Sequence, residues 1–224
     1  MAGQTRKGII VEFDFAAMNG AELLFGTAKR YLKALDGIAF DKAAEARHFA
    51  GCNYQGGLAE YFALVKTKKT ATKAAKGIAD AFREALNAEV PKAVTPAFRN
   101  FVNILVERDV KVVLSTRADL DAVRDAFGGM LSDSVVLYQE TSSTYGSLKW
   151  DAWRRACVVN KLRNLSTVAI TGSGFGVKSA LVAGMGAVAV MCDNVAWQDF
   201  GGADEIIDEL NAKSARKVLE VLRL

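Results

Sequence analysis

The chain has 224 residues, of which 51% are hydrophobic, 24% are charged and only two are prolines. This composition is that of a globular protein, and it excludes a disordered tail, a collagen and a simple coiled coil. The length predicts one large domain or a core domain with a small appendage, and the net charge of +4 is too small for the dense basic stripe of a nucleic-acid-binding protein.

The first half of the chain is dominated by predicted helices. An apolar run at 8–15, with β-branched residues at its centre, predicts a buried strand that Glu12 and Asp14 interrupt. Helical spacing and Ala-rich composition then predict helices over 21–35, 41–50, 56–66 and 70–88. We expect Pro91 and Pro96 to bracket a linker that leads into a helix at 97–107.

The second half alternates between short apolar runs and helical segments. The predicted strands are 110–114, 135–138, 168–171 and 187–191, and the predicted helices are 118–127, 148–163, 177–184 and 203–222. This alternation predicts an α/β fold with a Rossmann-like parallel sheet wrapped by helices. The all-helical residues 22–90 are then a cap domain inserted after the first strand, and residues 1–21 and 91–224 form the α/β core.

Ligands of open parallel sheets bind at the carboxyl ends of the strands. The polar residues at those ends are therefore the candidates for a functional site. They are Glu12, Asp14, Ser115, Lys149 and the residues 171–173.

These positions resemble the four motifs of the haloacid dehalogenase-like (HAD) superfamily of phosphatases and related hydrolases, over residues 7–210. The first motif, a strand ending in Asp-x-Asp-Gly-Thr-Leu-x-Asp-Ser, is matched by IIVEFDFAAMNG at 9–20. A strand ending in Ser or Thr is matched by VVLS at 112–115, and a Lys before a helix by Lys149. The fourth motif resembles TGSGFGVKSALVAGM at 171–185, and this match is the most specific because glycine and helix positions align without a gap.

The resemblance implies phosphoryl-transfer chemistry. The family's first Asp attacks phosphorus to form an aspartyl-phosphate, and the Asp two residues later is the general acid and base. Mg²⁺ is held by the nucleophile and the acidic residues of the fourth motif, while the Ser or Thr and the Lys hold the phosphoryl oxygens. On this resemblance the catalytic positions are Glu12, Asp14, Ser115 and Lys149, and Asp14 is a metal ligand if Mg²⁺ binds.

The chain departs from the motifs at the reactive positions. In one register Glu12 replaces the nucleophile and Asp14 keeps the acid/base position, but the longer Glu side chain displaces the carboxylate by about 1 Å, which can cost about 100-fold in rate. In the other register Asp14 is the nucleophile and Ala16 replaces the acid/base. In both, Gly172 stands where the metal-binding Asp belongs, and Asp193, which ends the next strand, would be an unusual substitute.

Each candidate also has a structural interpretation. Glu12 and Asp14 could cap backbone groups or pair with Lys149, and Lys149 could form another structural ion pair. Ser115 could be the N-cap of the helix that follows it. The loop at 172–176 could bind an anion at a helix start or form a tight turn inherited with the fold.

Two further features indicate surfaces. Trp150 and Trp153 lie three residues apart on one predicted helix, which favours a place in the core or in an interface. Residues 26–95 hold twelve Lys or Arg against seven Asp or Glu. That excess favours a solvated helix face, with an anionic substrate or an acidic partner as alternatives. Phe15 places bulk beside the expected phosphate pocket.

Cysteine and histidine content limits the remaining chemistry. Cys52, Cys157 and Cys192 are odd in number and lack metal-binding spacing, which indicates a reducing intracellular compartment, cytoplasmic or an organellar matrix. The single histidine, His48, lies in a predicted helix and is interpreted as structural. No apolar run is long enough to span a bilayer, and no nucleic-acid partner is expected.

Two functional hypotheses follow. The first is a HAD-like pseudoenzyme, a non-catalytic structural or scaffold subunit of a larger assembly, with protein partners and no cofactor. The lost motif residues and the intact apolar frame favour it. The alternative is a divergent Mg-dependent HAD-like phosphatase or hydrolase that acts on a small phosphorylated molecule.

Overall fold

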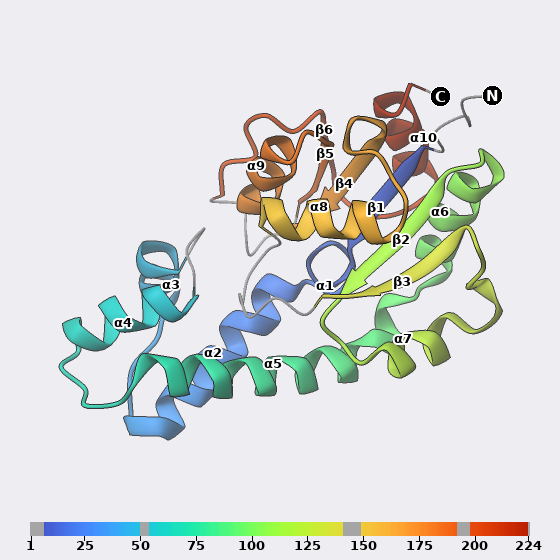
Figure 1. The fold of residues 1–224 in the computed structure, drawn as a ribbon. Coiled ribbons are helices and arrows are strands. Elements are labelled where there is room, and N and C mark those ends of the chain that lie inside the picture. The colour runs from blue at the N-terminus through green and yellow to red at the C-terminus, as the bar shows by residue number, and fades with distance from the viewer. Residues whose placement is uncertain (1–6, 50–53, 141–148, 192–197, 224) are drawn as a thin grey trace.

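The computed structural model describes residues 7–49, 54–140, 149–191 and 198–223. Within them the strands form one parallel sheet in the order β3-β2-β1-β4-β5-β6 (Figure 1). The strands are β1 (Gly8–Glu12), β2 (Lys111–Thr116), β3 (Val135–Gln139), β4 (Thr167–Thr171), β5 (Gly186–Val190) and β6 (Glu205–Ile207). The predicted α/β fold with a parallel sheet is confirmed.

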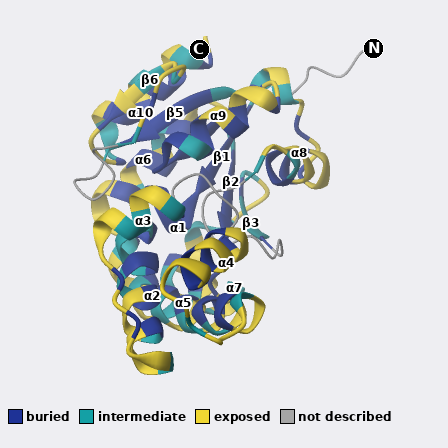
Figure 2. Ribbon diagram, turned by 90° about the vertical axis from the view of Figure 1, so that its left-hand side faces the viewer, coloured by how far each residue is buried: buried dark blue, intermediate teal, exposed yellow. Residues whose placement is uncertain are grey.

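The two faces of the sheet bury different side chains because successive residues of a strand point to opposite sides. Ile9 and Val11 join the larger apolar cluster, whereas Ile10, between them, joins the smaller one. The central strands are buried on both faces, as expected for a parallel sheet covered by helices. Figure 2 shows these strands as buried, between helices whose outward faces are exposed.

Helices cover both faces of the sheet. On one side, α8 (Trp150–Val159) and α9 (Gly174–Val182) pack through the smaller cluster. On the other, α6 (Pro96–Glu107), α7 (Leu120–Phe127) and α10 (Ala212–Val221) pack through the larger one. Two short 3₁₀ turns, η1 (Gly128–Met130) and η2 (Asn164–Ser166), lie between α7 and β3 and between α8 and β4.

A helical layer follows β1 and extends away from the sheet. It comprises α2 (Gly20–Asp36), α3 (Lys42–His48), α4 (Tyr54–Leu64) and α5 (Ala71–Ala93), and Figure 1 shows α5 as a long helix that runs from this layer to α7. The Phe82 ring of α5 lies 6.4 Å from the Phe15 ring. Asn87 Nδ2 donates to Asp119 Oδ2 at 2.7 Å, and Asp119 N donates to Asn87 Oδ1 at 2.8 Å. The predicted helical insertion after the first strand is therefore present, and α5 ties it to the core.

Three sequence predictions differ from the structure. The first strand ends at Glu12, and residues 13–16 form the helical turn α1 (Phe13–Ala16), because Phe13 turns into the core between the rings of Phe98 and Phe127. Pro91 lies inside α5 and not in a linker; it is close to the helix end, where few backbone hydrogen bonds remain to be lost.

The third difference concerns the predicted helix at 203–222. Its first part is the edge strand β6, and α10 begins only at Ala212. The Asn211 side chain accepts hydrogen bonds from the backbone of Lys213 and Ser214, and the Ser214 hydroxyl completes a capping box. That cap fixes where the helix begins.

Several other predicted features can be placed. His48 ends α3 and packs against Tyr61 of α4 within the helical insertion, with ring centroids 5.5 Å apart. Cys157 is a free, buried thiol, whereas Cys52 and Cys192 lie outside the described residues. None of the helices in the described ranges is long and apolar enough to cross a membrane.

Phe82 provides a test of how the helical insertion is attached. Its side chain is 1% exposed, so Phe82→Ala would leave a cavity beside Phe15 and lower the free energy of unfolding by about 3–5 kcal/mol. Urea unfolding followed by circular dichroism measures this. Leu64→Ala is the control, because Leu64 is 61% exposed and should change stability by only about 0.5 kcal/mol. Equal unfolding midpoints for the two variants would contradict the packing described.

Candidate active site at the strand ends

Three strand ends bring polar side chains together at the centre of the sheet. Glu12 ends β1 and is the register partner of Ser115 on β2, and Thr171 ends β4 on the other side of β1. All three are 1% exposed or less. This is the point at which the strand order reverses direction, where ligands of open α/β sheets bind. The sequence-predicted positions Glu12 and Ser115 are therefore neighbours.

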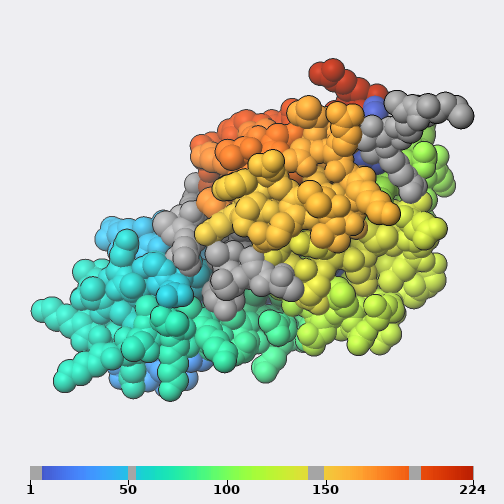
Figure 3. All heavy atoms as spheres, viewed as in Figure 1, coloured from blue at the N-terminus to red at the C-terminus, as the bar shows by residue number. Residues whose placement is uncertain are grey.

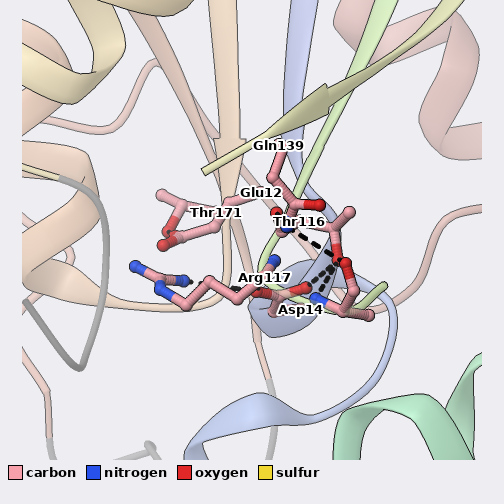
Figure 4. Close-up of polar contacts among 7 residues, drawn as sticks. Glu12, Asp14, Thr116, Arg117, Gln139 and Thr171 are labelled. Atoms are coloured by element: carbon pink, nitrogen blue, oxygen red, sulfur yellow. Dashed lines mark hydrogen bonds and ion pairs between the residues drawn. The ribbon is translucent and has the colours of Figure 1, made fainter. Parts of the chain in front are cut away.

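Glu12 is hydrogen bonded within the protein. The Thr171 hydroxyl donates to Glu12 Oε2 at 2.5 Å (Figure 4), and it also accepts from the backbone N–H of Ser173 at 3.3 Å. A buried carboxylate is stable only when such donors reach it. Glu12 is therefore part of a connected network that joins β1 to the start of the loop after β4.

Asp14 is held by the last residue of β2 and by the residue that follows the strand. Thr116 Oγ1 donates to Asp14 Oδ1 at 2.5 Å, and Arg117 donates to Oδ2 from its backbone N–H at 2.9 Å and from Nη1 at 3.2 Å (Figure 4). Asp14 is 0% exposed. Burial raises the pKa of the Asp14 carboxyl above its ordinary value, and the Arg117 charge and the three hydrogen bonds oppose that rise.

The loop that holds Asp14 is itself fixed. Thr116 Oγ1 accepts from the backbone N–H of Ala118 at 3.0 Å, and Gln139 Nε2 donates to the carbonyls of Thr116 and Ala118 at 3.3 and 3.2 Å. Arg117 is 7% exposed, and its guanidinium carbon lies 5.9 Å from the Phe15 ring centroid. Both oxygens of Asp14 are thus engaged by donors that cannot easily move.

Sequence reasoning missed Arg117 as the partner of Asp14. The signal that could have found it is position: Arg117 follows the end of the strand beside β1, and a buried carboxylate needs a nearby cation. Lys149, the partner considered from sequence, is the N-cap residue of α8. Among the hydrogen bonds and ion pairs of the described residues, none joins Lys149 to Glu12 or Asp14.

Ser115 has an unusual environment for a buried hydroxyl. It lies within β2, and the N-cap residue of α7 is Asp119, so the predicted helix-capping role of Ser115 is wrong. Its Oγ atom is buried, and no hydrogen-bond partner for it is found in the part of the chain that the structure describes. A buried hydroxyl normally finds one, so Ser115 Oγ is a position at which a ligand oxygen could bind.

The turn after β4 leaves no room for a metal-binding side chain. A Cβ atom at Gly172 would lie 2.2 Å from the Phe15 carbonyl oxygen and 2.8 Å from the Phe15 carbonyl carbon. The backbone of α1 therefore fills the volume that an Asp at this position would need. Glycine is required here by close backbone approach.

The described residues do not fit a Mg²⁺ site. Mg²⁺ prefers several carboxylate and water oxygens in octahedral geometry. Asp14 is already held by Arg117, and Gly172 supplies no oxygen ligand from a side chain. No group of three or more His, Cys, Asp or Glu side chains in the described parts of the chain is placed to hold a metal ion. Asp193, the substitute considered from sequence, lies outside the described residues.

The glycine-rich loop donates to the protein's own side chains. Ser173 is the N-cap of α9 and accepts from the backbone N–H of Gly176 at 2.9 Å. The N–H of Gly174 donates to Gln198 Oε1 at 2.7 Å. These bonds satisfy donors that a bound anion would otherwise use, and they support the interpretation of 172–176 as a tight strand-to-helix turn.

Comparison with solved structures identifies the fold. A structural alignment covers 97% of this chain and 97% of a β-phosphoglucomutase from Clostridium difficile, with a TM-score of 0.72 and 13% sequence identity. A mutant of CbbY from Rhodobacter sphaeroides, solved with xylulose-(1,5)bisphosphate, gives a TM-score of 0.66 and 16% identity over 92% of this chain and 95% of that one.

A HAD family hydrolase from Deinococcus radiodurans, with bound phosphate and sodium, gives a TM-score of 0.57 and 15% identity over 97% of this chain and 96% of that one. The chain has the HAD-like fold. No family model and no curated protein sequence matches it, so the likeness is one of structure, and it confirms the fold that the sequence motifs predict.

Arg117→Met tests the role of the buried ion pair. Removing the guanidinium leaves Asp14 without a compensating charge, so we expect the free energy of unfolding at neutral pH to fall by about 3–5 kcal/mol. The matched control is Arg124→Met, whose ion pair with Asp121 is at the surface and should contribute at most about 1 kcal/mol.

The same variant should show a characteristic pH dependence. Because the folded-state pKa of Asp14 is raised, the folded protein keeps this proton at pH values where the unfolded chain has lost it, and stability falls as pH rises through that window. Without Arg117 the pKa rises further. The stability difference between Arg117→Met and wild type should therefore shrink as pH falls toward the ordinary carboxyl range. A difference that stays constant would contradict the pairing.

Gly172→Ala tests the close approach of α1. The added Cβ meets backbone atoms that cannot rotate away, so a loss of about 1–3 kcal/mol in unfolding free energy is expected. Gly56→Ala in α4 is the control, since a Cβ there meets nothing within 4 Å and alanine favours the helix by about 0.5–1 kcal/mol. The midpoint temperature of thermal unfolding should fall for Gly172→Ala and rise for Gly56→Ala. A higher midpoint for Gly172→Ala than for wild type would overturn the argument.

Proposed function

We propose that this chain is a HAD-fold protein that does not catalyse Mg²⁺-dependent phosphoryl transfer and acts instead as a structural or scaffold subunit. The proposal rests on one observation: the protein's own groups occupy the positions at the carboxyl ends of the strands that a substrate and a metal would need. The carboxylate of Asp14 is held on both oxygens by Thr116 and Arg117, and the Phe15 backbone fills the space beside Gly172.

Neither motif register leaves a working pair of carboxylates. With Glu12 as nucleophile, Asp14 would have to exchange a proton with the leaving group, but it is fully buried and hydrogen bonded to fixed donors. A general acid must be within hydrogen-bond reach of the substrate atom that it protonates. With Asp14 as nucleophile, Ala16 has no carboxyl group to activate water. Both registers therefore lack a step that the family's chemistry needs.

The sheet and the helices around these positions have the arrangement of the HAD-like fold. The register of β1 with β2 and β4, both apolar layers and the helical insertion are all present. A protein that has this fold but whose strand-end carboxylates are engaged by its own side chains is suited to binding other proteins through its surface. The proposal accordingly includes protein partners and no Mg²⁺.

A second function has one observation in its favour. The buried Ser115 Oγ atom has no hydrogen-bond partner within the described ranges. Ser115 lies beside Glu12 in register, where an oxygen of a phosphate group could accept a hydrogen bond from its hydroxyl. Two of the structures with the same fold hold phosphate or a sugar bisphosphate. On this alternative the chain is a divergent phosphohydrolase for a small phosphorylated molecule, with Glu12 as the attacking carboxylate.

A phosphatase assay separates the two functions. The purified full-length chain is incubated with an aryl phosphate, with and without Mg²⁺, beside Glu12→Gln, which preserves size and removes the charge. We expect no turnover above the buffer rate in either protein. Turnover by the wild type that Glu12→Gln abolishes and Ser115→Ala lowers would overturn the scaffold proposal.

The scaffold role has its own readout. Gel filtration of native extract should place the chain well above the 24.1 kDa of the free polypeptide. A monomeric elution volume together with turnover would favour the phosphohydrolase.

A further inference from the structure

The face of α8 that points away from the sheet carries apolar side chains where a solvated helix normally carries polar ones. Ala152, Trp153, Ala156 and Cys157 point into the core and are 1% exposed or less. Trp150, Arg154 and Val158 follow one another at helical spacing of four along the outer side. Trp150 is 48% exposed and Val158 is 76% exposed. The two tryptophans considered together in the sequence therefore serve different surfaces.

The apolar side chains continue past the end of α8. Val159 is 65% exposed, Leu165 in the η2 turn 85%, and Val182 at the end of α9 72%. Asn164 Nδ2 donates to the Ala183 carbonyl at 2.7 Å, which packs the turn against the end of α9. We define the α8 surface by its exposed side chains: Arg154, Val158, Val159, Lys161, Leu165 and Val182. Figure 3 shows α8 and the turn after it uncovered on the face toward the viewer.

This region also holds an excess of positive charge. Residues 149–185 contain six Lys or Arg and one Asp, a balance of +5, compared with +4 for the whole chain. Arg155 pairs with Asp151 at 2.7 Å, and Lys178 pairs with Asp199 at 2.7 Å. Among the described residues, no carboxylate forms a salt bridge with Arg154 or Lys161. The apolar centre is thus bordered by unbalanced cations.

The turns that carry the α8 surface are hydrogen bonded through their backbone. Lys161 N donates to the Val158 carbonyl at 3.1 Å, Leu162 N to the Cys157 carbonyl at 2.9 Å, and Ser166 N to the Arg163 carbonyl at 2.9 Å. Valine side chains have few rotamers, so little conformational entropy would be lost on contact. Aliphatic side chains on hydrogen-bonded turns suit a partner of fixed shape.

A concave feature adjoins the α8 surface. A groove of about 370 Å³ extends from Leu165 to the amino-terminal edge of the sheet, with Lys7, Arg223 and Asp204 in its lining. Asp204 Oδ2 already accepts the backbone N–H of Ala187 at 2.8 Å. The groove is therefore a hollow beside the exposed Leu165, in which Lys7 Nζ already donates to the carbonyl oxygens of Leu222 and Arg223.

We propose that the α8 surface binds a folded protein partner that presents an apolar centre bordered by Asp or Glu. Charge complementarity selects this occupant. Arg154, whose guanidinium carbon lies 5.8 Å from the Trp150 ring centroid, and Lys161 form no salt bridge among the described residues. Cations beside exposed aliphatic side chains favour carboxylates and disfavour other cations. A second copy of the chain would bring two such cationic surfaces together across a twofold axis. A membrane-surface helix lays a long apolar face on lipid, whereas the long apolar face of α8 is already buried in the core.

This surface lies at the end of the sheet opposite Glu12 and Asp14. The η2 turn precedes β4, whereas the candidate site follows the carboxyl ends of the strands. The inference is therefore independent of whether the strand ends are catalytic. It goes beyond the proposed scaffold role by naming the surface and the chemistry of what covers it.

Site-specific photocrosslinking of the chain in native cell extract tests the proposal. A benzophenone amino acid replaces Leu165 in one protein and the similarly exposed Leu64 in a control. We expect a discrete crosslinked product from position 165, absent from position 64, that weakens as salt is raised. The partner peptide, mapped by mass spectrometry, should contain Asp or Glu next to apolar residues.

Charge reversal provides the matched comparison. Arg154→Glu with Lys161→Glu should lower the yield of the product by at least about tenfold. Lys69→Glu with Lys73→Glu, which makes the same charge change on exposed residues of the helical insertion, should leave it unchanged. Circular dichroism should report a native fold in both.

Four outcomes would overturn the proposal. They are no product specific to position 165, a product unaffected by the Arg154 and Lys161 reversals, a product that joins two copies of this chain, and a partner peptide without carboxylates. Binding of the purified chain to phosphatidylserine-containing vesicles, lost in the same charge-reversal variant, would assign the surface to a membrane and would also overturn it. None of these results depends on the phosphatase assay.

Discussion

The buried ion pair between Asp14 and Arg117 is the contact on which the strand-end structure depends. A carboxylate that is fully excluded from water is tolerated only when it is paired and hydrogen bonded. Here the pairing joins α1, directly after β1, to the loop directly after β2. The ion pair therefore fixes the path of the chain at the carboxyl ends of the strands, where ligands of open parallel sheets bind.

The path of α1 in turn determines what the neighbouring loop can be. With Asp14 drawn toward β2, the Phe15 carbonyl lies against the turn after β4, and only glycine fits at position 172. The contact of Asp14 with Arg117 engages a carboxylate that Mg²⁺ would need, and the contact of the Phe15 carbonyl with Gly172 fills the space for another ligand. A fold does not by itself determine an activity. In the function proposed above, the fold depends on burial, whereas phosphoryl transfer would depend on carboxylates that can reach a substrate.

The sequence predicted best those elements that are marked by long apolar patterns. The parallel sheet, the helical insertion and the adjacency of Glu12 and Ser115 follow from strand alternation and from the motifs at the strand ends. It failed where short segments are decided by tertiary contacts. An apolar run cannot show that Phe13 turns into the core, and a three-residue strand such as β6 is too short to carry a period. The choice of Arg117 over Lys149 as the partner of Asp14 depends on loop geometry that spacing alone does not contain.

The central claim is that the strand ends hold their charges internally and do not bind a divalent cation. Titration of the full chain with Mn²⁺, as a paramagnetic substitute for Mg²⁺, measures this directly through the electron paramagnetic resonance signal of the free ion. The account predicts that the signal grows in step with added metal, identically for wild type and Glu12→Gln. Saturable, stoichiometric loss of the free-ion signal in wild type, abolished by Glu12→Gln, would contradict it.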